Sequence, residues 1–156
     1  MAIPISLEQF LSYHHVEYKI VKHPKTASSL HTARAANIPG DQLVKSVILE
    51  DENGYLMAVL PASRRVELGK LSKMTRRRLG LATEPELNDL FADCESGAVP
   101  PVGRAFGVDT IWDDSIAIMP DVYFEAGDHE ELVHMTNMQF QRLIQHNRHG
   151  NFSRRI

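Results

Sequence analysis

The sequence predicts an α+β fold in one domain, because its clearest strands gather in two hairpins and helical patterns lie between them. The first hairpin joins strands at 43–50 and 55–60 through Asn53-Gly54, a dipeptide that readily adopts the positive φ of a tight turn. The second joins strands at 121–125 and 132–135. No repeat or Pro/Gly-rich linker divides the 156 residues. We therefore expect a single domain over 1–156, with a core at about 5–146 and a frayed polar tail at 147–156.

Two capping patterns place helices. Ser6 and Gln9 have the spacing of a capping box before apolar residues at helical intervals, which predicts a helix at about 7–15. Thr83 and Glu86 repeat this spacing with Pro85 in the first turn, so a second helix should run through about residue 93. The other expected elements are a strand at 18–22, helices at 30–36, within 66–79 and from 137 onward, and apolar stretches at 110–112 and 115–119.

The composition is that of a soluble globular protein. Hydrophobic residues make up 43% and charged residues 24%, which argues against disorder, a coiled coil or a membrane span. The first residues lack the basic and apolar regions of a signal peptide, so we expect a cytoplasmic protein. Cys94 is the only cysteine, so no disulfide can form within the chain.

Basic residues are unevenly distributed although the net charge is −3. Between residues 64 and 78 there are seven basic side chains and one acid, Glu67. After Glu131 there are no acids, while arginines and histidines accumulate. This asymmetry indicates that one side of the molecule is basic and could bind a polyanion. The alternative interpretation is a set of solvated helix faces and a loose tail.

A lysine and a loop suggest a ligand pocket. Lys45 interrupts the apolar strand at 43–49. An ammonium group there either reaches the solvent-exposed rim of the sheet through its flexible side chain or binds an anion such as phosphate. Gly97 to Gly103 form a loop of small residues in which Pro100 and Pro101 fix the path, so its backbone can approach a small substrate closely. The alternatives are that Lys45 is the outward residue of an edge strand and that the prolines simply turn the chain.

Other chemistries have weaker support. The adjacent pair His14-His15 and the pair His146 and His149 do not bring the third and fourth ligands of a zinc site, so no metal is expected. The Gly97 loop has prolines where phosphate-binding glycine loops need donor amides, so no cofactor is indicated. Cys94 is the candidate nucleophile of a small-molecule hydrolase, but its acidic neighbours raise its pKa, which favours a packed or surface thiol.

These features together resemble the YbaK/prolyl-tRNA synthetase-associated domain family, the freestanding relatives of a synthetase editing domain. The similarity runs from about His23 to Ile144. It rests on the order and spacing of the segments at 43–47, 55–61, 64–71, 97–101 and 124–127. The resemblance implies a mixed, mostly antiparallel sheet or a partly closed barrel with surrounding helices. It also implies an aminoacyl-tRNA deacylase that removes the amino acid from mischarged tRNA in trans, without a metal or cofactor and with help from the substrate's own ribose hydroxyl and a bound water.

The resemblance also implies roles for individual residues. Lys45 would hold the phosphate or ribose end of the acceptor terminus, and the loop would position the aminoacyl carbonyl. The implied catalytic residues are Lys45, Gly97 and Pro100. The implied substrate-binding residues are His23, Ser46, Ala98, Val99, Pro101, Gly127, Asp128 and His129. The implied tRNA-binding residues are Arg64, Arg65, Lys70, Lys73, Arg76, Arg77 and Arg78.

Three questions stay open at this point. Many relatives carry a basic or small residue after the late Ala-Gly, whereas this chain continues with Asp128, so His129 could orient water, orient the amino group or cap a turn. Alanine on proline tRNA is one candidate substrate, with cysteine, serine and threonine as others. A non-catalytic module that binds tRNA or a synthetase is the alternative function.

Overall fold

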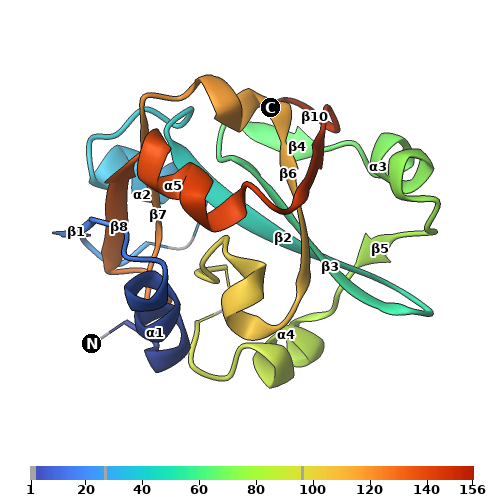
Figure 1. The fold of residues 1–156 in the computed structure, drawn as a ribbon, viewed down its shortest axis with the longest axis horizontal. Helices are drawn as coiled ribbons and strands as arrows, with labels where there is room; N and C mark the ends of the chain where they lie inside the picture. Colours follow the sequence, from blue (N-terminus) through green and yellow to red (C-terminus); the bar gives the residue numbers. More distant parts are fainter. Residues whose placement is uncertain (1–2, 27, 96) are drawn as a thin grey trace.

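The computed structural model describes residues 3–26, 28–95 and 97–156 as an α+β fold (Figure 1). Its α-helices are α1 (Ile5–Tyr13), α2 (Ser29–Ala35), α3 (Leu68–Thr75), α4 (Glu84–Leu90) and α5 (Asn137–Ile144). Two 3-10 helices are η1 (Gly103–Phe106) and η2 (Asp114–Ile118). The strands are β1 (Lys19–Lys22), β2 (Leu43–Asp51), β3 (Gly54–Pro61), β4 (Arg64–Val66), β5 (Gly80–Leu81), β6 (Asp109–Asp113), β7 (Asp121–Glu125), β8 (Glu131–Thr136), β9 (Arg148–Gly150) and β10 (Ser153–Arg155).

The main sheet is mixed and mostly antiparallel, as predicted. Its strand order is β1-β8-β7-β2-β3-β6-β9, and β5 also pairs with β2. The β2–β7, β3–β6 and β6–β9 pairs are parallel. Within the described residues the path ends at β1 and at β9 and does not close, so the sheet is not the barrel that was the alternative. A separate two-stranded ribbon joins β4 to β10.

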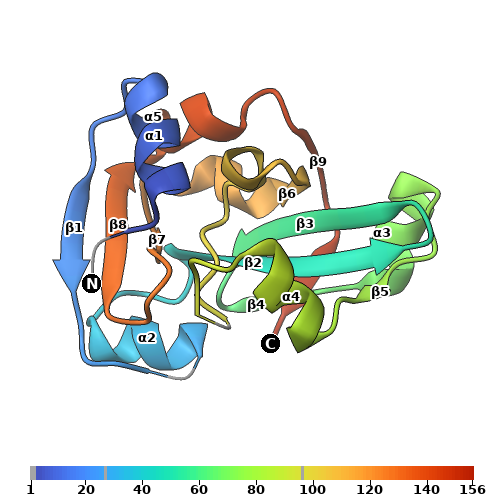
Figure 2. The same cartoon turned by 90° about the horizontal axis from the view of Figure 1, so that it is seen from below.

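Both predicted hairpins are confirmed. The β2–β3 hairpin runs in register from Val44 opposite Pro61 to Asp51 opposite Gly54, which adopts a φ of 130° in the turn. Its far end lies beside β5 and α3 (Figure 2). The β7–β8 hairpin pairs Asp121 with Thr136, and its connection at 126–130 lies beside α2 (Figure 2).

Helices cover both faces of the sheet. Successive side chains of a strand point to opposite faces, so apolar residues on both faces can pack against helices. On one face, Val44 and Ile48 of β2 belong to a large apolar cluster that includes residues of α1 and α5. On the other face, Leu49 packs in a cluster with Leu71 of α3, and Leu43 packs in a cluster with α2. Figure 2 shows α1 and α5 together on one side and α2 on the other.

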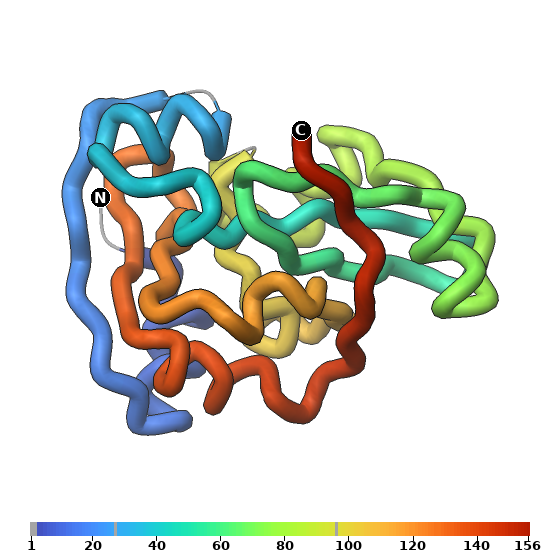
Figure 3. The backbone as a smooth tube through the Cα atoms, turned by 90° about the horizontal axis from the view of Figure 1, so that it is seen from above, coloured from blue at the N-terminus to red at the C-terminus, as the bar shows by residue number. Residues whose placement is uncertain are grey.

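The prediction of a frayed polar tail at 147–156 was wrong. Residues 148–150 and 153–155 form β9 and β10, and Phe152 between them is fully buried. Figure 3 shows this last segment running across the molecule. The Phe152 carbonyl also accepts a hydrogen bond from the Glu67 amide at 2.8 Å. One large buried apolar side chain thus anchors a segment that is otherwise mostly polar.

Helix ends differ from the prediction in two places. Helix α1 begins at Ile5 after an N-cap at Pro4, so Ser6 lies inside the helix and makes no cap. Helix α4 has the predicted capping box at Thr83 and Glu86, but it ends at Leu90. The stretch at 115–119 falls largely in η2 and forms no strand. No helix in the described part of the chain is long and apolar enough to cross a membrane.

Candidate functional site

The candidate site lies at a gap along one edge of β2. On this edge β2 pairs with β7 only at Leu43 and Val44, and with β5 only at Leu49 and Glu50. Residues 45–48 therefore have no strand partner there in the described pairings. The Gly97 loop occupies the gap, since the Ser46 hydroxyl donates to the Val99 carbonyl at 2.8 Å.

Backbone hydrogen bonds also fix the other side of this loop. The Glu95 amide donates to the Gly127 carbonyl at 2.7 Å, and the Ala98 amide donates to the Glu95 carbonyl at 3.0 Å. Ala98, Val99, Pro100 and Pro101 are buried, whereas Gly97 is exposed with a φ of 80°. The loop therefore presents Gly97 to solvent on a base of packed side chains.

A small cavity lies beside the loop. Its volume is about 220 Å³, and its lining includes Ser46, Ile48, Leu87, Gly97 and Val99. Three of these were predicted from the sequence as site residues, and they meet here from β2 and the loop. The lining is largely apolar, and the volume suits a small side chain.

Lys45 lies on the face of β2 opposite Ser46, as strand alternation requires. Its ammonium is half-buried and donates to the Ala62 carbonyl at 3.4 Å. Burial lowers the pKa of Lys45. Among the described residues no carboxylate lies within ion-pair distance of this group. A partly desolvated cation without a carboxylate is suited to receive an anionic ligand.

The register of the β2–β7 pair brings a buried carboxyl to the same face. Leu43 is opposite Tyr123 and Val44 is opposite Phe124, so extending the parallel register aligns Lys45 with Glu125. The Glu125 side chain is buried, and burial raises its pKa. Its Oε1 accepts a hydrogen bond of 2.8 Å from the Thr32 hydroxyl of α2.

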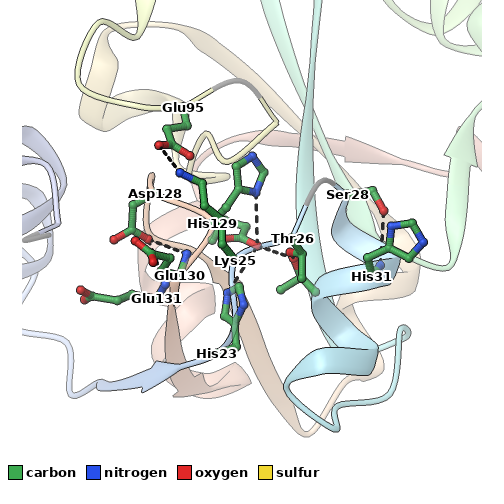
Figure 4. A network of polar contacts seen from close by, with 12 residues as sticks. His23, Lys25, Thr26, Ser28, His31, Glu95, Asp128, His129, Glu130 and Glu131 are labelled. Atoms are coloured by element: carbon green, nitrogen blue, oxygen red, sulfur yellow. Dashed lines mark hydrogen bonds and ion pairs between the residues drawn. The ribbon is translucent and has the colours of Figure 1, made fainter.

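Two histidines complete this buried cluster (Figure 4). Glu125 Oε1 lies 3.8 Å from His23 Nε2 and 3.9 Å from His129 Nδ1. The His23 side chain is fully buried, and its Nδ1 donates to the Pro24 carbonyl at 2.7 Å. The His129 ring faces the loop, because a Cβ added to Gly97 would lie 3.4 Å from its Cε1 atom. His129 therefore connects the buried carboxyl to the exposed Gly97.

The turn that carries His129 has a fixed backbone. Asp128 is buried, and its Oδ1 accepts from the amides of Glu130 and Glu131, both at 2.9 Å. Gly127 and His129 adopt φ values of 114° and 60°. Asp128 thus stabilises the turn, while His129 reaches the loop.

The chain matches the aminoacyl-tRNA editing domain model over residues 23–143. It belongs to this family. The editing domain superposes on a structure of a hypothetical protein with a TM-score of 0.83 and 18% identity, covering 96% of this chain and 99% of that chain. It also superposes on a structure of a candidate trans-editing enzyme for prolyl-tRNA synthetase, with a TM-score of 0.82 and 23% identity over 98% and 99% of the two chains. Among curated protein sequences, none matches.

The basic residues predicted to bind tRNA lie on β4, on α3 and in the segment after it, and none of them lines the cavity beside the loop of the editing domain. Two of them make internal contacts: Arg77 donates to both carboxylate oxygens of Asp51 at 2.8 Å, and Arg64 donates to the Ser153 hydroxyl at 2.7 Å. The others are exposed on β4, α3 and the segment after it, namely Arg65, Lys70, Lys73, Arg76 and Arg78.

Glu125 and Thr32 were missed as site residues. The available signal was Glu125, a carboxyl that follows the apolar run 122–124 and lies four residues before His129. Thr32 gave no signal, because the position of α2 over the end of β7 depends on tertiary packing.

Cys94 is poorly suited to nucleophilic attack. Burial, followed by the negative charge of Asp93, raises the pKa of the Cys94 thiol to about 12. The thiolate is the reactive form, and this pKa leaves little of it near neutral pH. In the described ranges, no group of three or more His, Cys, Asp or Glu side chains is arranged to hold a metal ion.

Proposed function

We propose that this editing domain is a cytoplasmic deacylase that hydrolyses the aminoacyl ester of mischarged tRNA in trans. The observation that carries the proposal is the Gly97 loop, fixed in the gap of β2 next to Lys45. Synthetase pockets separate amino acids that differ by one small group by only ~1–3 kcal/mol, so a later hydrolytic step has a clear purpose.

In this proposal Lys45 binds the phosphate or ribose end of the acceptor terminus. Its ammonium is held at the Ala62 carbonyl and has a lowered pKa because it is buried, so an anionic ligand would return favourable electrostatic energy. The loop from Gly97 to Pro101 positions the aminoacyl carbonyl through its backbone.

Hydrolysis needs only one covalent exchange. Water adds to the carbonyl carbon, the bond from that carbon to the ribose oxygen breaks, and the ribose oxygen receives a proton. The substrate's own ribose hydroxyl and a bound water would assist this step, and His129 beside Gly97 would orient the water or the amino group. The cavity of about 220 Å³ would admit a small amino-acid side chain and exclude a larger cognate one.

The exposed basic residues of β4 and α3 would contact the tRNA backbone, an interaction that is sensitive to salt and indifferent to sequence. Arg65, Lys70 and Lys73 are the exposed members on these elements. Arg64 and Arg77 would act mainly by holding β10 and Asp51.

The test is release of labelled amino acid from a panel of mischarged tRNAs at fixed salt. The wild-type chain is compared with Lys45→Ala and with the control Lys19→Ala, which removes an exposed lysine from β1. We expect selective release that Lys45→Ala abolishes and Lys19→Ala retains, with both variants folded by circular dichroism. Full activity of Lys45→Ala would refute its assignment. Tight tRNA binding without any turnover would instead support the non-catalytic binding module.

A further inference from the structure

A second cavity lies away from the Gly97 loop, between η1, the start of β6 and the segment that links α5 to β9. Its volume is about 380 Å³, and it shares no lining residue with the cavity in the β2 gap. β6 and β9 are parallel neighbours there, with Ile111 opposite Arg148 (Figure 2). The cavity therefore belongs to the far edge of the main sheet.

Its charged lining is mostly basic. Arg77, Arg104, Arg148 and His146 line it together with a single carboxylate, Asp109. The rest of the wall combines the apolar side chains of Leu56, Val108 and Ile111 with the polar ones of Thr75, Thr110 and Asn147. Because Arg77 is paired with Asp51, the guanidinium groups of Arg104 and Arg148 against Asp109 leave a small excess of positive charge in a concave surface, which concentrates anions.

The arginines have donors available for a ligand. Arg77 uses Nε and Nη2 for Asp51 and the Gly54 carbonyl, which fixes the group in place. Its Nη1 has no hydrogen-bond partner among the residues described. Arg148 donates from Nη2 to the Met74 carbonyl at 3.2 Å. No ion pair or hydrogen bond of the Arg104 guanidinium occurs within the described chain.

Arg104 also acts on His14, which does not line the cavity. The pKa of His14 on α1 is lowered, first by burial and then by the positive charges of Arg104 and Arg142. Like charges that approach without compensation cost free energy, and an anion would relieve that cost. Guanidinium groups suit phosphate because their paired N–H donors match its oxygens.

We infer that this cavity binds a phosphate group, either of a small phosphorylated ligand or of an RNA backbone. The site does not depend on the ester hydrolysis proposed for the Gly97 loop, and neither Lys45 nor the exposed Arg65 of β4 lines it. Binding at the cavity would give the editing domain a second anion contact besides Lys45.

The test is a nuclear magnetic resonance titration of the full chain that follows the arginine Nε–H and His146 signals. Pyrophosphate and a short RNA hairpin are added in separate experiments. The variant is Arg104→Gln, and the control is Arg34→Gln, which makes the same charge change at an exposed position of α2 outside the cavity. We expect saturable shifts of the cavity signals and roughly tenfold weaker binding for Arg104→Gln only.

Each outcome has a defined meaning. Saturation by pyrophosphate supports a small phosphorylated ligand. Saturation by the hairpin alone, with a salt dependence reduced by about one contact in Arg104→Gln, supports an RNA phosphate. Absence of saturable shifts with both ligands, or equal weakening by Arg104→Gln and Arg34→Gln, would overturn the inference. Because the readout is binding, a chain inactive in deacylation still tests it.

Discussion

Replacing Glu125 tests whether the buried cluster holds a neutral carboxyl. His23 Nδ1 must carry a proton, because its partner at 2.7 Å is the Pro24 carbonyl, which only accepts. If the ring is neutral, Nε2 presents a lone pair toward Glu125 Oε1 at 3.8 Å. A protonated carboxyl removes that repulsion. Burial raises the pKa of Glu125, which agrees with a neutral acid.

The variants Glu125→Gln and Glu125→Ala separate the possibilities. An amide stays neutral and accepts from Thr32 through the oxygen at the Oε1 position, so we expect Glu125→Gln to unfold within about 1 kcal/mol of wild type at pH 7. Glu125→Ala leaves buried polar groups unsatisfied and a small void, so we expect a loss of about 2–4 kcal/mol. Urea denaturation monitored by circular dichroism measures both.

The dependence on pH gives an independent check. A carboxyl whose folded pKa exceeds its ordinary value of 4.5 contributes stability that is complete below that value and is lost as the pH rises through the folded pKa. Each unit of elevation corresponds to about 1.4 kcal/mol. Wild type should therefore lose stability relative to Glu125→Gln as the pH rises above 4.5. A Gln variant as unstable as the Ala variant at pH 7 would refute the neutral carboxyl and indicate an ionised Glu125 paired with a charged His23.

Three further predictions use other parts of the fold. Phe152→Ala should lower the free energy of unfolding, measured in urea, by about 3–5 kcal/mol, because the ring is fully buried. An unchanged urea midpoint would instead support a frayed C-terminal tail. Gly97→Ala should lower the free energy of unfolding by about 1–2 kcal/mol, because the φ of Gly97 is 80°, and should reduce deacylation. The control Gly69→Ala in α3 should leave stability unchanged or raise it. Equal effects in the two variants would argue against a special role of the loop backbone. Asp51→Asn should make the melting temperature depend less on pH in acid. Arg77 lowers the pKa of Asp51 to about 2, so ionised Asp51 contributes stability above its ordinary pKa of 3.8, and this contribution is lost as the pH falls through 2. The same pH dependence in variant and wild type between pH 5 and 2 would contradict this.

The sequence predicted the parts of the fold that local chemistry determines. Asn53-Gly54 located the first hairpin, and Thr83 with Glu86 located the start of α4. The capping pattern at Ser6 predicted the wrong first residue of α1, because the helix already begins at Ile5 after the N-cap Pro4. The last strands were missed because Phe152 stabilises them through contacts with residues distant in the sequence.

The candidate site was predictable only in part for the same reason. Ser46, Gly97 and Val99 were predicted, and they do meet at one cavity. The gap in β2 that brings them together depends on where β5 and β7 stop pairing, which no local pattern specifies. The sequence also did not indicate that His23 is fully buried, because its position depends on Glu125 and α2.

The two anchors of the Gly97 loop use main-chain atoms at the loop end: the Val99 carbonyl on one side and the Glu95 amide on the other. Side chains at these positions can therefore be exchanged while both hydrogen bonds remain. Under the proposed deacylase function, a substitution at Val99, which lines the cavity, would change the amino-acid preference while both anchors remain. Selectivity could then evolve separately from the hydrogen bonds that hold the loop.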